Sequence, residues 1–164
     1  MLGLLWKQGP CTAYAIRRSL LGSPSSHWSG SAGAIYPLLR RFEERGLATS
    51  RKTLRGDRAG WQYALTAAGR ERLLAWLGPP MTGEVVAIAA DPLRTRAHFL
   101  GVLPPKRRAT FLAAAKEALE RHLGDLAPRG AVDRFDRLAL RSAVRVTQAR
   151  LAWLAEVGRS LGDS

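Results

Sequence analysis

The clearest hydrophobic pattern in the chain lies between residues 32 and 45. Four apolar side chains recur there at helical spacing (i, i+3, i+4 and i+7): Ile35, Leu38, Leu39 and Phe42. This spacing places all four on one side of a helix, where they form a single buried stripe. Ser31 is positioned to cap the N-terminus of that helix, and Gly46 is positioned to end it. The sequence therefore predicts a helix over Ala32–Arg45.

Two shorter helices are predicted before it. The first covers Leu2 to about Lys7 and stops at Gly9-Pro10. The second runs from Ala13 to Leu21, with the Thr12 hydroxyl as its N-cap. Its expected core contacts are Tyr14, Ile16 and Leu20.

After Gly46 the pattern changes from helical to extended. Residues 47–54 and 61–65 have strand-like composition and enclose a glycine-flanked basic tip at 55–60, which predicts a β-hairpin. Trp61 and Tyr63 alternate toward one side of the second strand and are expected in the core. Thr66 can cap a fourth helix that ends near Leu77. The inward-facing residues expected on that helix are Leu73, Leu74 and Leu77.

This order of elements predicts a mainly α fold with a small β-hairpin. Three helices, a hairpin and a further helix are typical of a winged helix-turn-helix domain, which we assign to residues 1–77. A cluster of glycine and proline at 78–83 begins a linker over residues 78–90. Residues 91–164 are expected to form an α-helical dimerisation domain.

The second half contains three predicted helices. They cover Leu93 to Val102, residue 105 to about Leu126, and about Val132 to Leu161. In the middle helix the residues expected to be buried are Phe111, Leu112, Leu119 and Leu123.

Apolar positions in the last helix alternate at spacings of four and three, a heptad seam. The seam residues that we assign to dimerisation are Leu140, Val144, Thr147, Leu151, Leu154 and Leu161, with Gly158 at the same spacing. A helix of this length extends ~45 Å at ~1.5 Å per residue, which is long for a seam buried within so small a monomer. Pairing with a second copy is the favoured interpretation, and folding back onto the two preceding helices is the alternative.

The charge balance narrows the class of partner. The 164 residues include 26 Lys and Arg against 13 Asp and Glu, a net charge of +13 that favours a polyanion. Residues 1–77 carry a net +8 and the remainder +5. The single cysteine, Cys11, and the lack of an apolar run of membrane-spanning length favour a cytoplasmic location without membrane association.

The side of the third helix opposite its apolar stripe has the properties of a DNA-reading surface. It is small or flat near the N-terminus and carries arginines in the middle, as a helix entering the major groove requires. The residues assigned to DNA binding on this helix are Ser31, Gly33, Tyr36, Pro37, Arg40 and Arg41. Pro37 lies inside the helix, and Gly33 gives the backbone room to accommodate its ring.

The predicted hairpin adds four cations to this surface. They are Arg51, Lys52, Arg55 and Arg58, which we also assign to DNA binding. Such residues can hold phosphates along the minor groove. The alternative is that they only prevent edge-to-edge aggregation of strands.

Several blocks of the first 77 residues resemble the PadR family of bacterial transcription regulators. The most specific block is Ile35-Tyr36-Pro37-Leu38-Leu39, with Phe42-Glu43 and Gly46-Leu47 after it. Weaker blocks are Gly9-Pro10 with Tyr14 and Ile16, and Tyr63-x-Leu65-Thr66-x-x-Gly69-Arg70. Asp91-Pro92-Leu93-Arg94 is similar to the family branch with a longer C-terminal helical domain. Ala59 and Trp61 depart from the pattern, since the wing often has proline and a basic residue there.

The resemblance implies a homodimeric, usually repressing regulator of double-stranded DNA that dimerises through its C-terminal helices. It also implies DNA contact by Tyr36, Arg40 and the wing. Members of the family respond to small aromatic ligands, and residues that could line an effector pocket here are Trp153, Trp76, Phe99 and His98. A place in the core is the alternative for each of the four.

The sequence shows no catalytic constellation, metal-ligand spacing or cofactor motif, which favours a binding protein over an enzyme. The function predicted is that of a ligand-responsive homodimeric repressor at a palindromic operator. A winged-helix adaptor for proteins and an RNA-binding module remain alternatives.

Overall fold

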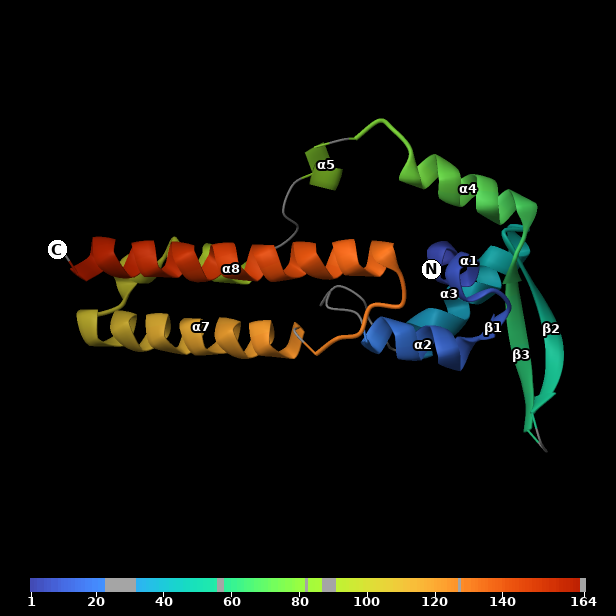
Figure 1. Ribbon diagram of the computed structural model, residues 1–164, viewed down its shortest axis with the longest axis horizontal. Helices are drawn as coiled ribbons and strands as arrows, with labels where there is room; N and C mark the ends of the chain where they lie inside the picture. Colours follow the sequence, from blue (N-terminus) through green and yellow to red (C-terminus); the bar gives the residue numbers. More distant parts are fainter. Residues whose placement is uncertain (23–31, 56–57, 82, 87–90, 127, 163–164) are drawn as a thin grey trace. The chain divides into compact units, whose positions relative to one another are not determined.

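The computed structural model describes residues 1–22, 32–55, 58–81, 83–86, 91–126 and 128–162. The chain divides into two compact units, Met1–Val86 and Ala87–Ser164. The N-terminal unit contains α1 (Leu2–Gln8), β1 (Cys11–Thr12), α2 (Ala13–Leu21), α3 (Ala32–Glu44), β2 (Ala48–Arg55), β3 (Arg58–Leu65), α4 (Ala67–Leu77) and α5 (Gly83–Val86). The C-terminal unit contains α6 (Pro92–Ala97), a 3-10 turn (Leu100–Val102), α7 (Pro105–Leu126) and α8 (Arg134–Gly162) (Figure 1).

The mainly helical fold with a small antiparallel sheet is confirmed. The sheet has three strands in the order β1-β3-β2, one more than the expected hairpin. The additional strand, β1, pairs Cys11 with Tyr63 and Thr12 with Gln62. It attaches the turn between α1 and α2 to the middle of the hairpin.

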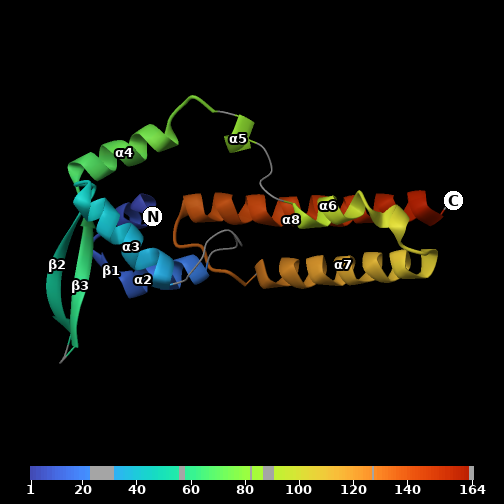
Figure 2. The ribbon, with the colours of Figure 1, turned by 180° about the vertical axis from the view of Figure 1, so that it is seen from behind.

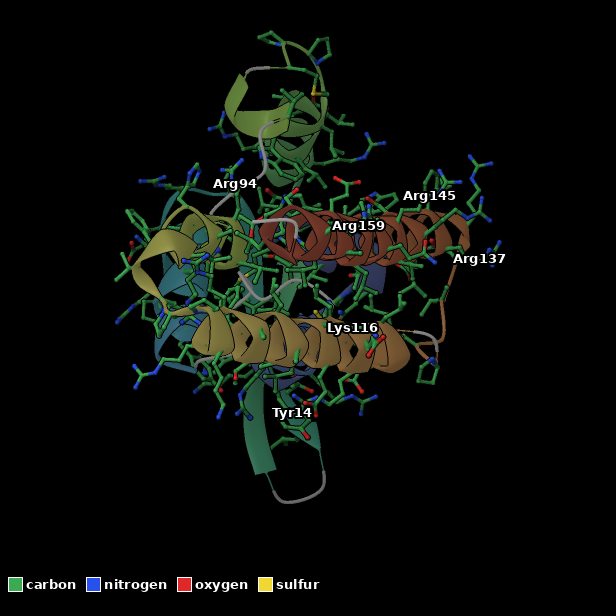
Figure 3. The ribbon with its side chains drawn as sticks, turned by 90° about the vertical axis from the view of Figure 1, so that its left-hand side faces the viewer. Tyr14, Arg94, Lys116, Arg137, Arg145 and Arg159 are labelled. Atoms are coloured by element: carbon green, nitrogen blue, oxygen red, sulfur yellow. The ribbon has the colours of Figure 1, made fainter. Side chains whose placement is uncertain are left out.

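The core of the N-terminal unit lies between the first three helices and the inner face of the sheet. Its fully buried side chains are Leu5, Ile16, Ile35 and Leu39. The expectation of a buried Tyr14 is wrong, because its side chain is 66% exposed and points outward from α2 (Figure 3). Only one side of α2 faces the core. Ile16 and Leu20 lie on that side, and Tyr14 does not.

The predicted caps are present at α2 and α4. The Thr12 hydroxyl accepts a hydrogen bond from the backbone N–H of Ala15 at 3.2 Å, and the Thr66 hydroxyl accepts one from Gly69 at 3.0 Å. Gly69 has a second role: a Cβ atom there would lie 2.0 Å from the carbonyl oxygen of Leu47. Glycine therefore allows the first turn of α4 to lie directly against the turn between α3 and β2.

Two details of the hairpin and α4 differ from the sequence prediction. The strands extend as far as the Arg55–Arg58 pair, so the tip is shorter than residues 55–60. Of the three leucines expected to face inward on α4, only Leu73 is buried, whereas Leu74 and Leu77 are 45% and 56% exposed. This helix contacts α1 through a single row, in which the Leu73 side chain lies against Gly3.

In the C-terminal unit, α7 and α8 run antiparallel and pack along each other (Figures 1 and 2). The buried residues of this pair are Leu119, Leu126, Thr147 and Leu154. The helix expected over Leu93–Val102 is interrupted, because α6 ends at Ala97 and the chain turns at Phe99 before the 3-10 turn. Arg150 on α8 pairs with Asp91 at the start of α6, with 2.9 Å between Nη2 and Oδ2.

The heptad seam of α8 faces α7 of the same chain. Thr147 and Leu154 are 4% and 5% exposed without a second copy. The argument that a single chain is too small to bury this seam is therefore wrong at these two positions. The antiparallel α7, 22 residues long, supplies the surface that covers them. Among the described residues, no helix is both long and apolar enough to cross a membrane.

Candidate nucleic-acid interface

The outer face of α3 presents flat and cationic groups to solvent. Tyr36 is 56% exposed, and the Arg40 side chain is 83% exposed. Pro37 and Arg41 lie on the same exposed side, while Ile35 and Leu39 hold the opposite side in the core. The helix continues through Pro37 without a break. The only restraint on Arg40 among the described contacts is a long ion pair with Glu44, 4.0 Å from Nε to Oε1.

The hairpin forms an arm with two different faces. In the β2–β3 register Ser50 opposes Tyr63 and Lys52 opposes Trp61, on the face that turns toward α3. Arg51 opposes Gln62 on the other face. Arg51 and Lys52 are thus divided between the two faces of the wing.

A hollow separates α3 from the inner face of the wing. Its lining residues are Tyr36, Pro37, Arg40, Glu43, Ser50, Trp61 and Tyr63. The Ser50 hydroxyl donates a short hydrogen bond to the Glu43 carboxylate across it. Burial raises the pKa of the Tyr63 phenol, with smaller contributions from Glu43 and Tyr36, so Tyr63 is a neutral hydrogen-bonding group at pH 7.

Trp61 is a member of this hollow that sequence reasoning placed in the core. The alternation with Tyr63 is correct, but the core ends before Trp61, which is 48% exposed. Its ring centre lies 5.7 Å from the Lys52 ammonium. Glu43 and Ser50 were also missed, since nothing in their spacing along the sequence links a helix residue to one strand position.

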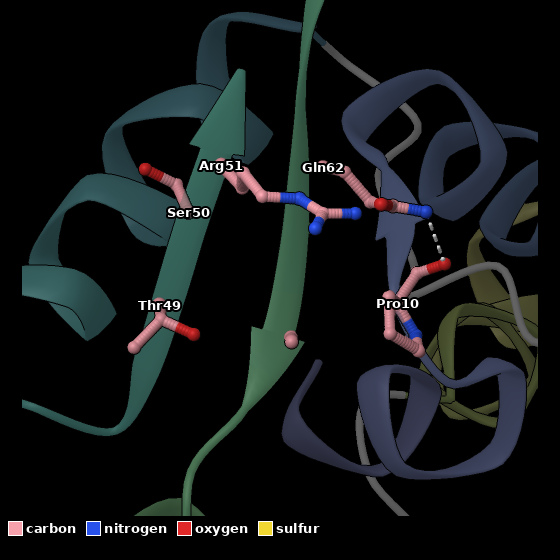
Figure 4. Close-up of a pocket in the computed structure, with 6 residues that line it drawn as sticks. Pro10, Thr49, Ser50, Arg51 and Gln62 are labelled. Carbon is pink, nitrogen blue, oxygen red and sulfur yellow. Dashed lines mark hydrogen bonds between the residues drawn. The ribbon is translucent and has the colours of Figure 1, made fainter. Parts of the chain in front are cut away.

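A second, shallow hollow lies on the outer face of the sheet. Pro10, Thr49, Ser50, Arg51, Gln62 and Ala64 line it. Figure 4 shows the Arg51 side chain lying across the strands toward Gln62, whose amide donates a 3.0 Å hydrogen bond to the Pro10 carbonyl oxygen. This bond joins the wing to the turn before β1.

The remaining predicted site residues are scattered or fall outside the description. Ser31 lies outside the described residues, as do the side chains of Arg55 and Arg58. Trp76 and Phe99 are 75% and 66% exposed, so the alternative of a core position is wrong for both. Trp76 belongs to the N-terminal unit, while Phe99, His98 and Trp153 belong to the C-terminal unit. None of the four lines either hollow.

The chemistry of the site is that of binding. Within the described part of the chain, no group of three or more His, Cys, Asp or Glu side chains is placed to hold a metal ion. The α3–wing hollow instead brings aromatic surface together with the cations of Arg40 and Lys52. This combination suits an anionic polymer that also has flat or apolar parts.

Comparison with known proteins agrees with this geometry. Residues 1–75 match the family model described as "Transcriptional regulator PadR-like family". The curated "Negative transcriptional regulator PadR" of Bacillus subtilis is 26% identical over 129 residues, which cover 77% of this chain and 68% of that protein.

Two solved structures share the fold over nearly the whole chain. Bacillus subtilis PadR in complex with operator DNA superposes with a TM-score of 0.79 at 23% identity, covering 98% of this chain and 95% of that one. The same protein in complex with p-coumaric acid gives a TM-score of 0.77 at 22% identity, with 98% and 95% coverage. The matched family and these relatives are transcriptional regulators and not enzymes.

Proposed function

Because residues 1–75 match the PadR-like family of transcriptional regulators, we propose that the chain is a member of this family that binds a palindromic operator as a homodimer and represses transcription in the cytoplasm. The observation that carries this proposal is the outer face of α3. Tyr36, Arg40 and Arg41 are exposed on it while its other side is locked into the core. The resemblance to a negative regulator supports repression.

The proposed mode of binding places α3 in the major groove. Gly33, Tyr36 and Pro37 allow close approach near the start of the helix, and Arg40 and Arg41 can grip guanine edges or phosphates. Ser31 before the helix is assigned to a phosphate, as are the wing cations Arg51, Lys52, Arg55 and Arg58. The division of Arg51 and Lys52 between two faces of the sheet supports contact with phosphates on both sides of the wing.

The proposed homodimer uses the C-terminal unit. Phe135, Leu138 and Val146 on α8 are 58%, 57% and 45% exposed, which leaves apolar surface for a second copy. Four further residues assigned to the dimer lie on another side of α8, beside the buried Thr147 and Leu154. They stay half-exposed in the single chain and are Leu140, Val144, Leu151 and Leu161. A two-fold dimer presents two α3 helices to one duplex, which explains a palindromic operator.

A small aromatic effector is part of the proposal. The complex of Bacillus subtilis PadR with p-coumaric acid supports it by analogy. Trp153, half-buried on α8, is the best-placed of the four candidate pocket residues, since Trp76, Phe99 and His98 are exposed. Release of DNA requires only that the effector favour a dimer geometry in which the two α3 helices no longer match the groove spacing.

Footprinting on the DNA upstream of the protein's own gene tests the proposal. We expect a protected palindrome, and we expect Arg40→Ala to weaken binding by ~1–3 kcal/mol because a guanidinium contact to a base is lost. Arg145→Ala removes the same charge from an exposed position on α8 (Figure 3) and serves as the matched control.

Three results would contradict the proposal. Equal affinity of wild type and Arg40→Ala removes Arg40 from the site. Duplex binding that does not weaken with added salt argues against phosphate contact altogether and favours a protein-binding adaptor. Tighter binding to single-stranded or hairpin RNA than to duplex DNA favours the RNA-binding alternative.

A further inference from the structure

Trp61 lies on the wing at the point where the core of the N-terminal unit ends. It shares the inner face of the sheet with Tyr63, because the two residues are two positions apart on β3. Tyr63 is 8% exposed, whereas Trp61 is 48% exposed. A large indole therefore stands half outside the protein, beyond the last side chain that the core covers.

The surroundings of Trp61 combine aromatic surface with positive charge. Lys52 pairs with it across the two strands, and its ammonium lies 5.7 Å from the ring centre, within the range of a cation–π contact. From the other side of the hollow, Tyr36 and Arg40 of α3 face the same space. The nearby carboxylate of Glu43 is engaged by the Ser50 hydroxyl.

A nucleic-acid backbone presents the complementary chemistry, since apolar sugars alternate with anionic phosphates along it. We propose that Trp61 and Lys52 act together as a backbone contact for duplex DNA. The indole packs against a deoxyribose, the Lys52 ammonium binds the adjacent phosphate, and Tyr36 bounds the contact on the side of α3. This inference rests on the proposed function and deepens it, because it gives the wing an apolar contact in addition to charge.

The position of the hollow favours duplex backbone over other occupants. With α3 in the major groove and the wing at the neighbouring minor groove, the strand between the two grooves passes between α3 and the wing. That strand crosses the space lined by Tyr36 and Trp61. Lysine and arginine alone would bind its phosphates, but only an apolar surface gains from covering the sugars.

The test measures whether the indole of Trp61 meets DNA. The protein is labelled with 5-fluorotryptophan, and the fluorine resonance of Trp61 is assigned as the one lost in Trp61→Phe. The duplex protected in the footprint is then added until it saturates the protein. We expect the Trp61 resonance to shift on binding, while the resonance of Trp6, exposed on α1 away from the hollow, stays in place.

Affinities from fluorescence anisotropy separate the two parts of the contact. Trp61→Ala is expected to weaken binding about tenfold with an unchanged salt dependence, because no charge is lost. Lys52→Ala is expected to lower the slope of log affinity against log salt by about one. Trp61→Phe keeps an aromatic ring and is expected to retain most of the affinity, and Trp6→Ala is the control for loss of an exposed indole.

The outcomes distinguish this inference from the function on which it rests. If wild type binds the duplex in a salt-dependent way but the Trp61 resonance does not move, the proposed Trp61 contact is wrong and the proposed regulatory function is unaffected. If Trp61→Ala loses affinity only together with a lowered unfolding temperature, and the resonance is static, Trp61 is structural. A larger shift with single-stranded RNA than with duplex overturns the choice of partner, and no binding to any duplex overturns both proposals.

Discussion

The two units of the chain bury their apolar residues in different ways. Among the described residues, four of the five large side chains that are fully buried belong to the N-terminal unit, namely Leu5, Ile16, Ile35 and Leu39. The C-terminal unit contributes one, Leu126. Three helices and a sheet enclose a volume in the first unit, whereas the second consists mainly of two helices that share one line of contact.

This difference suits the two units to different roles. A filled core fixes the orientation of α3, so its exposed face is held ready for a ligand. A helix pair has a thin interface and leaves apolar side chains such as Phe135 and Leu138 on its surface. The first unit is thus suited to present a rigid reading surface, and the second is suited to join with a further copy.

The largest effect is expected from the core of the N-terminal unit. Leu39 is 0% exposed and anchors α3, so Leu39→Ala should lower the free energy of unfolding by ~2–5 kcal/mol. Leu54→Ala makes the same chemical change at a side chain that is 78% exposed and should cost less than ~0.5 kcal/mol. Urea unfolding of both variants measures the difference. Equal losses of unfolding free energy in the two variants would show that burial of Leu39 does not stabilise α3.

An intermediate effect is expected at the surface of α8. Val146→Glu places a charge among the exposed apolar side chains and should weaken self-association at least about tenfold, or ~1.4 kcal/mol. Ala152→Glu is the control, because this exposed alanine lies about 120° around the helix from Val146 and away from the seam residues. Sedimentation velocity over a concentration series measures both. If Val146→Glu leaves self-association unchanged, the dimer interface lies on another face of the unit.

The smallest effect is expected at the junction of α6 and α8. Although burial would raise the pKa of Asp91, the backbone N–H of Arg94 and the guanidinium of Arg150 lower it below its ordinary value. A carboxyl with a lowered pKa stabilises the fold above its unfolded-state pKa, and this stabilisation is lost as the pH falls from about 4 through the lowered value.

Asp91→Asn keeps the capping acceptor and removes only the charge. We expect it to cost ~0.5–1 kcal/mol at pH 7 and nothing once the wild-type carboxyl is protonated. Thermal unfolding of both proteins at a series of pH values from pH 7 down to about pH 2 gives the comparison. A difference between them that is the same at every pH value would contradict a role for the charge.

The helices and their caps could be predicted because their signals are local. Thr12 and Thr66 each precede an apolar periodic segment and cap the helix that follows. The apolar residues of α3 recur at spacings of three and four, so the buried and exposed sides of the helix follow directly from the sequence. The residues of α3 assigned to DNA binding are exposed for the same reason, and their role stays a prediction.

The remaining features depend on where the core ends, which no local pattern encodes. Strand β1 is two residues long, too short to show any alternation. Trp61 continues the inward alternation of Tyr63 but lies beyond the helices that would cover it. Likewise, the seam of α8 predicts a partner helix without saying that α7 of the same chain supplies it for Thr147 and Leu154.

The pairing of β1 with β3 offers a way to measure how often these two strands separate. Cys11, the single cysteine of the sequence, is 8% exposed opposite Tyr63, and burial raises the pKa of its thiol. A thiol-specific reagent can reach it only when this edge strand separates from its neighbour. The rate at which Cys11 is labelled therefore reports how often the sheet opens. It can be measured with and without DNA, and it requires no substitution in the chain.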